Sequence, residues 1–284
     1  MLTAITPSFG LQVNLARGAA RWHYVDMSDP VPKLRLRGVC KQFGDKVVLD
    51  GIDLDVMPRT SMVVIGGSGS GKSVLLKCIL GLLEPDSGSI EIDGNDLLTM
   101  PRAEREAARA QIGMLFQNGA LFDSLPVWEN VAFGLLARHK ITRAEAPSHA
   151  ASFLAQVGLA ESVGYLQPAE LSGGMQKRVA LARAIAAQPD ILFFDEPTTG
   201  LDPIMGAIID GLVVDCVKRL GSTAIAITHD MVSARRIGDQ AAMIHRGRII
   251  WNGPASELMD SHDPTVDQFT HGRREGPIEM ELRR

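Results

Sequence analysis

The sequence predicts an α/β fold: a mainly parallel sheet, a small antiparallel layer beside it, and a helical insert. Three observations indicate this fold. Short apolar runs at 61–65, 191–194 and 223–227 have the length and composition of strands buried on both faces. Alternating patterns at 34–40 and 47–56 flank a turn at Gly44-Asp45 and predict a hairpin, with a further short strand at 89–93. The stretch from 127 to about 164 has a helical pattern throughout.

Length and composition narrow the class of protein. The chain has 284 residues, of which 45% are hydrophobic and 22% charged, as in an ordinary globular protein of one large or two small domains. A net charge of −4 gives no support for a general nucleic-acid binder. Cys40, Cys78 and Cys216 lack metal-ligand spacing, and we expect reduced, buried thiols. No apolar run is long enough to span a bilayer, so a membrane role would require other chains.

The most informative motif is IGGSGSGKS at 65–73. Gly66, Gly71, Lys72 and Ser73 satisfy the phosphate-binding P-loop pattern, between a predicted strand and a predicted helix at 74–83. Such a loop turns successive backbone N–H groups toward one anion, and the helix N-terminus adds partial positive charge. Lys72 is expected to reach the β- and γ-phosphates, and the Ser73 hydroxyl to ligate Mg²⁺. The sequence therefore predicts a protein that binds a nucleoside triphosphate.

Acidic residues follow the apolar strand at 191–194. Asp195 and Glu196 stand at its carboxyl end, where open α/β sheets bind ligands. Asp195 can hold the Mg²⁺ that Ser73 ligates, and Glu196 can orient or deprotonate a water molecule. The strand at 223–227 ends in Thr228-His229-Asp230. His229 shares this sheet edge with the acids, and from the local sequence a structural and a functional role are equally favoured.

Two groups of aromatic and apolar residues allow two interpretations each. Phe43 precedes the hairpin turn and is either a core aromatic residue or a platform for a purine ring. An apolar segment at 114–116 ends on Gln117 and leads into a loop at 118–131. Four residues of that loop either pack inward or form an apolar face for a partner: Leu121, Phe122, Leu125 and Trp128.

Other local signals set the remaining elements. A charged helix is expected at 101–112, a helix at 171–187, and a closing hairpin at 241–244 and 248–251. Thr142 with Glu145 predicts a capping box, and Gly158 a helix C-cap. Residues 1–33 form an N-terminal arm for which a disordered segment, a transit peptide or a start at Met27 all remain open.

With these segments assembled, the chain resembles the ATP-binding-cassette ATPases over roughly residues 34 to 258. The signature LSGGMQKR at 171–178 is the most specific feature, and all the motifs occur in the family's order. The resemblance implies a P-loop NTPase (RecA-like) core at 34–262, with an antiparallel β subdomain and a helical subdomain at about 99–175. It implies that Phe43 stacks on adenine and that Gln117 senses the metal and γ-phosphate. Asp195 would bind Mg²⁺, Glu196 would be the catalytic glutamate, and His229 would contact the γ-phosphate.

The signature also implies a homodimer. In this family Ser172 and the Gly173-Gly174 amides cover the γ-phosphate held by the P-loop of a second copy, and Asp202 belongs to the D-loop at the same interface. One chain carries one P-loop and one signature, so it needs a second copy to complete a site. The implied cofactors are ATP and Mg²⁺, and the further expected nucleotide contacts are Val48, Gly67, Ser68, Gly69, Ser70, Val74 and Gln176.

A narrower resemblance covers two stretches. The segment LFQNGALFDSLPVWENVAFGL at 115–135 and the tail at 263–278 are similar to the Mla/MCE-type lipid transporters, although Thr270-His271 and Arg273-Arg274 depart from that pattern. The resemblance implies a permease dimer, a small STAS-like subunit and a lipid-binding MCE protein as partners. It also implies that the tail at 263–284, an extended segment with Phe269, Pro277, Ile278 and Met280, reaches the neighbouring subunit; a solvated tail is the alternative.

We therefore predict the ATP-hydrolysing subunit of a phospholipid transporter at the cytoplasmic face of a bacterial inner membrane. An importer ATPase for a small polar solute is the first alternative. A cassette protein that acts on ribosomes or DNA is the second, but such proteins usually carry two cassettes or long coiled-coil insertions, which this chain lacks. We predict no nucleic-acid partner.

Overall fold

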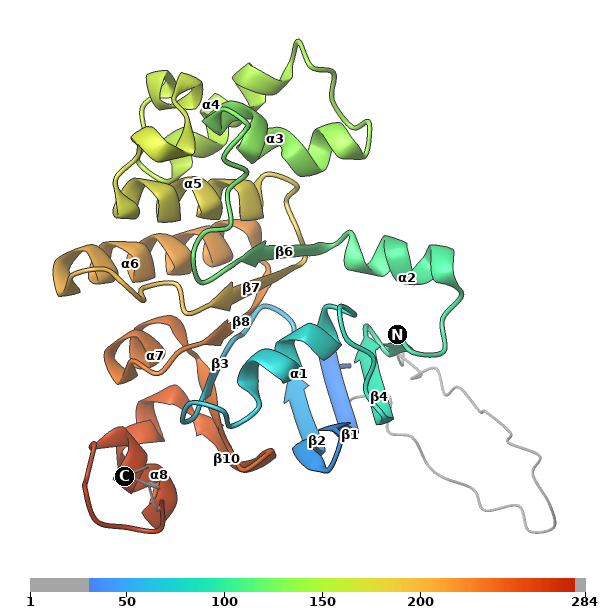
Figure 1. Cartoon of the computed structure of the whole chain (residues 1–284), viewed down its shortest axis with the longest axis vertical. Helices are drawn as coiled ribbons and strands as arrows, with labels where there is room; N and C mark the ends of the chain where they lie inside the picture. The colour runs from blue at the N-terminus through green and yellow to red at the C-terminus, as the bar shows by residue number, and fades with distance from the viewer. Residues whose placement is uncertain (1–30, 279–284) are drawn as a thin grey trace, which may run out of the picture.

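A computed structural model describes residues 31–278 of the chain, in which two sheets and their helices are arranged in layers (Figure 1). The larger sheet has six strands in the order β10-β9-β3-β8-β7-β6. All neighbouring pairs are parallel except β10 with β9, which form the predicted antiparallel hairpin. Its strands are β3 (Ser61–Ile65), β6 (Ile112–Leu115), β7 (Ile191–Asp195), β8 (Thr223–Ile227), β9 (Gln240–His245) and β10 (Arg248–Pro254).

Successive residues of the central strands enter different cores. In β3, Val63 and Ile65 pack with helices on one face, whereas Met62 and Val64 pack on the other. In β7, Phe194 joins the first core and Phe193 the second, and both are fully buried. This alternation follows from the two-residue period of a strand, and it explains why the sequence of these strands is continuously apolar.

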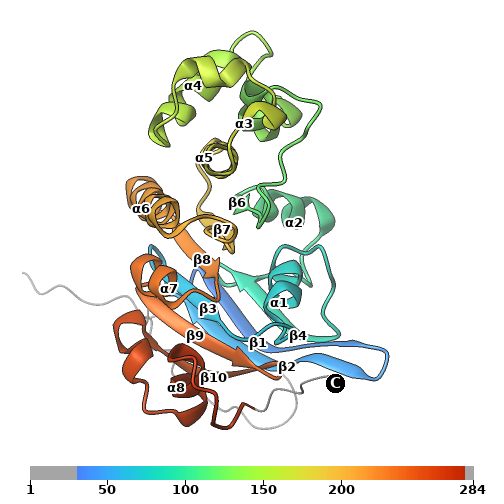
Figure 2. The same ribbon diagram turned by 60° about the vertical axis from the view of Figure 1, so that its left-hand side comes forward.

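One face of this sheet is covered by helix α1 and by the smaller antiparallel sheet, with strand order β2-β1-β4-β5 (Figure 2). The predicted hairpin is confirmed, because β1 and β2 pair antiparallel across the turn at Gly44-Asp45. The elements of this layer are β1 (Leu34–Phe43), β2 (Lys46–Val56), α1 (Lys72–Ile79), β4 (Ser87–Ile92) and β5 (Asn95–Asp96).

The other face is covered by helices α5, α6 and α7, and α3 and α4 lie beyond α5 at one end of the molecule (Figure 1). The helices are α2 (Arg102–Arg109), α3 (Val127–Ala137), α4 (Ala146–Gln156), α5 (Gly173–Ile185), α6 (Pro203–Leu220) and α7 (Met231–Ile237). Short 3₁₀ helices occupy η1 (Glu161–Tyr165), η2 (Pro168–Glu170) and η3 (Ala255–Asp260). Among the described helices, none has the length and apolar character to cross a membrane.

Several predicted helix boundaries are wrong for local reasons. The helix expected at 74–83 ends at Ile79, because Gly81 turns left-handed with φ +64° against the Arg109 guanidinium. The helix expected to reach residue 112 ends at Arg109, and Ile112 instead begins β6. The continuous helix predicted from 127 to 164 is broken between α3 and α4, where His139 has φ +53°.

Of two capping signals within the helical region, Gly158 agrees with the structure and the Thr142–Glu145 pair agrees only in part, because the Thr142 hydroxyl donates to the Glu145 carboxylate and the N-cap of α4 is Glu145 itself. The Thr142 backbone N–H donates to the Glu145 carboxylate at 2.8 Å, which is one half of the predicted capping box. Gly158 has φ +69° and follows the last turn of α4, as expected for a C-cap glycine.

The prediction of an extended tail is wrong for the described residues of this segment. Residues Pro264–Thr270 form helix α8, with Val266 fully buried and Phe269 packed against the larger core. After α8 the chain returns, and the Gln268 side chain bonds both the N–H and the carbonyl of Ile278, at 2.6 and 3.1 Å. Ile278 therefore packs on its own chain. Met280 and residues 1–30 of the predicted N-terminal arm lie outside the described residues.

Candidate nucleotide-binding and hydrolysis site

The P-loop joins β3 to α1, and two of its glycines are required by close backbone contacts. A Cβ atom on Gly66, which has φ +150°, would lie 2.2 Å from the Ile244 carbonyl oxygen. A Cβ atom on Gly71, which has φ +110°, would lie 2.8 Å from the Val48 carbonyl oxygen. Both positions therefore accept only glycine, and Val48 contributes its backbone to the wall of the loop.

The polar groups of this loop fit an anion. Lys72 is 8% exposed, and its Nζ donates to the carbonyls of Gly66 and Gly67 at 2.7 and 2.8 Å, so it lies within the curl of the loop. Burial lowers the pKa of Lys72, and the negative charges of Glu196 and Asp195 oppose that shift. The Ser70 hydroxyl is buried and has no partner among the described residues. Such an orphan donor matches a phosphate oxygen.

The carboxyl end of β7 places a carboxylate among the groups that the sequence predicted. Glu196 Oε2 accepts from Gln117 Nε2 and from Thr199 Oγ1, both at 2.9 Å. Its Oε1 lies 3.2 Å from His229 Nδ1. Gln117 follows β6, Glu196 follows β7 and His229 follows β8, so three neighbouring parallel strands deliver the cluster to one edge of the sheet.

Glu196 has an unusual backbone. Its φ is +47°, and its N–H donates to the Ile227 carbonyl at 2.8 Å. A non-glycine residue in this region costs about 1–3 kcal/mol and persists only where the surroundings over-determine it. The hydrogen bonds on both carboxylate oxygens supply part of that constraint.

Asp195 is the second acid of the cluster. Burial raises its pKa, and the neighbouring Glu196 charge raises it further, whereas Lys177 and Lys72 lower it. Two adjacent acids in a partly buried site favour a cation beside them, and Mg²⁺ takes few protein ligands, mostly carboxylate or hydroxyl oxygens. The exposed Ser73 at the start of α1 offers such a hydroxyl.

Helix α5 carries the predicted signature and is tied to the segment after Gln117. The Ser172 side chain caps α5 by accepting from the Met175 N–H at 3.3 Å. Ser172 and Gly173 are both exposed, so the N-terminus of α5 is open to solvent in the single chain. Lys177, only 6% exposed, donates from Nζ to the Gln117 carbonyl. Arg183 donates to the carbonyls of Gly119 and Ala120, at 2.6 and 2.7 Å.

The remaining predicted residues are not brought to the P-loop within one chain. Asp202 caps α6 by accepting from the N–H groups of Ile204 and Met205, both at 3.0 Å. Gln176 Nε2 donates to the carbonyls of Pro168 and Leu171, so it holds the start of its own helix. Phe43 is 49% exposed, with Lys41 Nζ 5.8 Å from the ring centroid.

Two contacts of the cluster were not predictable from the sequence. Thr199 hydrogen-bonds Glu196, and the only signal for it was a hydroxyl residue three positions after the acid. The second is the bond from Lys177 to the Gln117 carbonyl, which has no local signal because a buried lysine inside a helix cannot be recognised from spacing alone.

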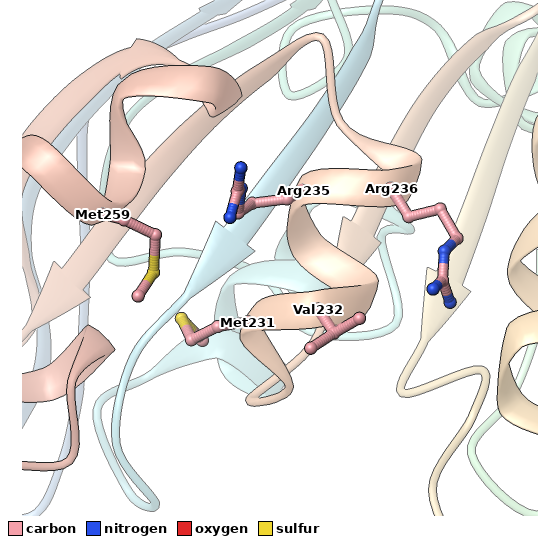
Figure 3. A pocket seen from close by; sticks show the side chains of 5 residues that line it. All are labelled: Met231, Val232, Arg235, Arg236 and Met259. Carbon is pink, nitrogen blue, oxygen red and sulfur yellow. The ribbon is translucent and has the colours of Figure 1, made fainter. Parts of the chain in front are cut away.

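A surface hollow lies apart from these groups. Its volume is about 360 Å³, and it is lined by Met231, Val232, Arg235, Arg236 and Met259, from α7 and η3 (Figure 3). None of these residues belongs to the P-loop or to the acidic cluster.

The fold and site together define a class: an α/β nucleotide-binding protein whose P-loop stands beside a hydrogen-bonded carboxylate at the edge of a parallel sheet. Residues 49–199 match the family model described as ABC transporter. The chain belongs to the ABC transporter family as an ATP-binding subunit, and it is an ATPase that binds ATP and ADP.

Related proteins and solved structures agree with this family assignment. The chain is 38% identical over 247 residues to "Probable ribonucleotide transport ATP-binding protein mkl" of Mycobacterium leprae, covering 87% of this chain and 71% of that one. It is 39% identical to "Intermembrane phospholipid transport system ATP-binding protein MlaF" of Haemophilus influenzae, covering 83% and 89%. The dimeric cassette MJ0796 in a post-hydrolysis state bound to ADP and Pi superposes with a TM-score of 0.71 at 30% identity, covering 78% of this chain and 98% of that one.

Proposed function

We propose that this protein is the ATP-hydrolysing subunit of a phospholipid transporter at the cytoplasmic face of a bacterial inner membrane. One observation supports the hydrolytic part above all others: the Glu196 carboxylate is held by Gln117, Thr199 and His229 beside the P-loop lysine. The transport part is supported by the functions for which related proteins are named.

The proposed roles follow from position. Lys72 and the P-loop amides hold the β- and γ-phosphates, and the Ser70 hydroxyl adds a donor there. Ser73, Asp195 and Gln117 are the ligands offered to Mg²⁺, which offsets phosphate charge when it is bound. Glu196 takes a proton from the attacking water, and His229 orients the carboxylate and reaches the γ-phosphate. Phe43, on the rim formed by the hairpin, stacks on the adenine ring.

A second copy completes each site. The N-terminus of α5 is formed by Ser172, Gly173 and Gly174. Within the described residues it makes no hydrogen bond to the chain's own P-loop, and an anion held by another copy would fit there. Asp202 lies beside it, since Gly174 packs against Met205 in the first turn of α6. Solved relatives are dimeric cassettes, which supports a homodimer.

A lipid is favoured as cargo for two reasons, of which the first points to a phospholipid. The relatives named MlaF, from Haemophilus influenzae and Escherichia coli, match over 89% and 90% of their own lengths. An Arabidopsis thaliana relative named for trigalactosyldiacylglycerol is 38% identical. A ribonucleotide or another small polar solute is the second candidate, because the mkl relatives carry that name. The proposed partners are an integral permease, a STAS-like subunit and an MCE-type lipid-binding protein.

The test is reconstitution. The tagged chain is purified in mild detergent with its permease and placed in liposomes that contain a fluorescent phospholipid. We expect ATP-dependent movement of the lipid between leaflets or to an acceptor, and none with Lys72→Ala in place of the wild-type chain. ATPase activity that responds to ribonucleotide and not to phospholipid would instead select the polar-solute function.

A further inference from the structure

A buried polar cluster joins α6 to α7 behind the acidic site. Asp210 of α6 and Ser233 of α7 are each 1% exposed. Ser233 Oγ lies 2.8 Å from both oxygens of the Asp210 carboxylate and donates its proton there. Arg236 donates to the same carboxylate at 3.0 Å, and Figure 3 shows its side chain leaving α7 on a different side from Arg235. A buried carboxylate requires such donors, so Asp210 fixes the orientation of the Ser233 hydroxyl.

The same hydroxyl reaches the loop that follows Glu196. Thr198 Oγ1 lies 3.2 Å from Ser233 Oγ. Since the single proton of Ser233 is directed to Asp210, Thr198 is the donor in this contact. Thr198 also lies against α6, because a Cβ atom added to Gly206 would be 3.6 Å from the Cβ atom of Thr198. Both helices therefore constrain the side chain of Thr198.

Thr198 stands two residues after Glu196, in the segment that sets the geometry of that carboxylate. The next residue, Thr199, donates from its backbone N–H to the Glu196 carbonyl at 3.3 Å and from its hydroxyl to Glu196 Oε2 at 2.9 Å. Glu196 itself has φ +47°, a conformation that needs support from its surroundings. The hydrogen bond from Thr198 to Ser233 is the link that ties this loop to α7.

We propose that Ser233 and Thr198 are positioning residues for Glu196, with Asp210 orienting the Ser233 hydroxyl. This inference rests on the proposed role of Glu196 in hydrolysis. The cluster also connects α6, which starts after Asp202 of the proposed dimer interface, with α7, whose N-cap Asp230 directly follows His229 of the site. A displacement of either helix therefore reaches the Glu196 carboxylate through the Thr198 loop.

The first test separates the hydroxyl of Thr198 from its shape. Thr198→Val keeps the volume and removes the hydroxyl, whereas Thr198→Ser keeps the hydroxyl and removes a methyl group. In the full chain we expect Thr198→Val to lower kcat for ATP hydrolysis about 10- to 100-fold with KM changed less than about 3-fold, because a misplacement of about 1 Å costs about 100-fold and a smaller one costs less. Thr198→Ser should keep kcat within about 3-fold of wild type. Equal activity of the two variants overturns the proposal.

The second test uses a matched serine. Ser233→Ala is compared with Ser222→Ala, which removes an equally buried hydroxyl that donates to the Pro189 carbonyl at 2.6 Å, at the opposite end of β8 from His229. We expect Ser233→Ala to lower kcat as Thr198→Val does, and Ser222→Ala to leave kcat unchanged although both lower the melting temperature. The Thr198→Val, Ser233→Ala double variant should be no slower than the slower single variant, because each single change already removes the same hydrogen bond between Thr198 and Ser233. Similar kcat losses in Ser233→Ala and Ser222→Ala would mean that Ser233 has only a structural role, and so would full additivity of the Thr198→Val and Ser233→Ala effects on kcat. Either result overturns the proposal.

Glu196→Gln is measured in parallel to separate the two hypotheses. If Glu196→Gln hydrolyses ATP at the wild-type rate, the proposed function of Glu196 fails, and this inference fails with it. If Glu196→Gln is inactive and Thr198→Val is as active as wild type, only this inference fails. Should Ser233→Ala not fold, the Thr198 pair decides alone, since neither of those changes alters more than one group.

Discussion

Replacing Glu196 by Gln changes one oxygen of the acidic cluster into an amide group and tests the proposed chemistry most directly. The shape of the side chain is kept, and its carbonyl oxygen can take the place of Oε2 and accept from Gln117 and Thr199 as before. The amide nitrogen then faces His229 Nδ1, which accepts in one tautomer. We therefore expect the melting temperature to stay close to that of wild type.

The expected effect on turnover is large. An amide cannot take a proton from water, and the loss of a general base slows a reaction about 10²- to 10⁴-fold, or about 2.7–5.4 kcal/mol of activation free energy. Nucleotide binding should strengthen, because a negative charge beside the phosphate site is removed while Lys72 remains.

The assay combines phosphate release with binding of a fluorescent ATP analogue and size exclusion with ATP and Mg²⁺. We expect slow release, tight binding and a dimer at low micromolar protein. Turnover within tenfold of wild type, from a variant that binds ATP normally, would refute the role of Glu196 as the base.

Three further predictions concern stability. Gly71→Ala should lower the melting temperature and nucleotide affinity together, because a Cβ at φ +110° meets the Val48 carbonyl at 2.8 Å; unchanged binding would contradict this contact. Burial raises the pKa of the Cys78 thiol from 9.0 to about 11, so the stability gained from the neutral thiol is complete below pH 9 and is lost as the pH rises toward 11. Cys78→Ala should make the melting temperature flatter between pH 9 and 11, and an unchanged slope would assign the alkaline loss to other groups. Truncation after Ser261 removes the fully buried Val266, worth about 1.5–3 kcal/mol, together with the partly buried Phe269, and should lower the melting temperature of the isolated chain by about 3 °C or more, whereas no change would mean that α8 adds nothing to the core.

The parts of the fold that the sequence predicted well are those set by strong local patterns. The predicted strands at 61–65, 191–194 and 223–227 are mainly apolar on both faces, and the structure buries them between two cores. The P-loop glycines were equally predictable, since Gly66 and Gly71 occupy backbone positions that exclude a side chain. The grouping of Glu196 with His229 followed from parallel strands that end at one edge of a sheet, whereas Gln117 was placed beside them only by the family resemblance.

The parts that failed depend on contacts between distant segments. Nothing in 101–112 signals that Ile112 pairs with β7 and leaves the helix. The tail was expected to be extended because its apolar residues are widely spaced, but the Gln268 side chain closes a return that brings Ile278 back to the core. Ser233 and Asp210 lie 23 residues apart, and their pairing across two helices has no local signature.

The way α5 holds the segment after Gln117 has a consequence for how this family can vary. The hydrogen bonds that Lys177 and Arg183 make to this segment all go to backbone carbonyls, those of Gln117, Gly119 and Ala120. The one side-chain contact among the described residues is that of the Arg183 guanidinium, which lies 6.0 Å from the centroid of the Phe122 ring. A carbonyl is present whatever the side chain, so the path of this segment is fixed independently of what it displays. The hydrogen bonds from α5 therefore persist when side chains after Ala120 are exchanged to suit a different membrane partner, and the Gln117 amide stays beside the Glu196 carboxylate. Exchange of Phe122 in addition removes its contact with Arg183.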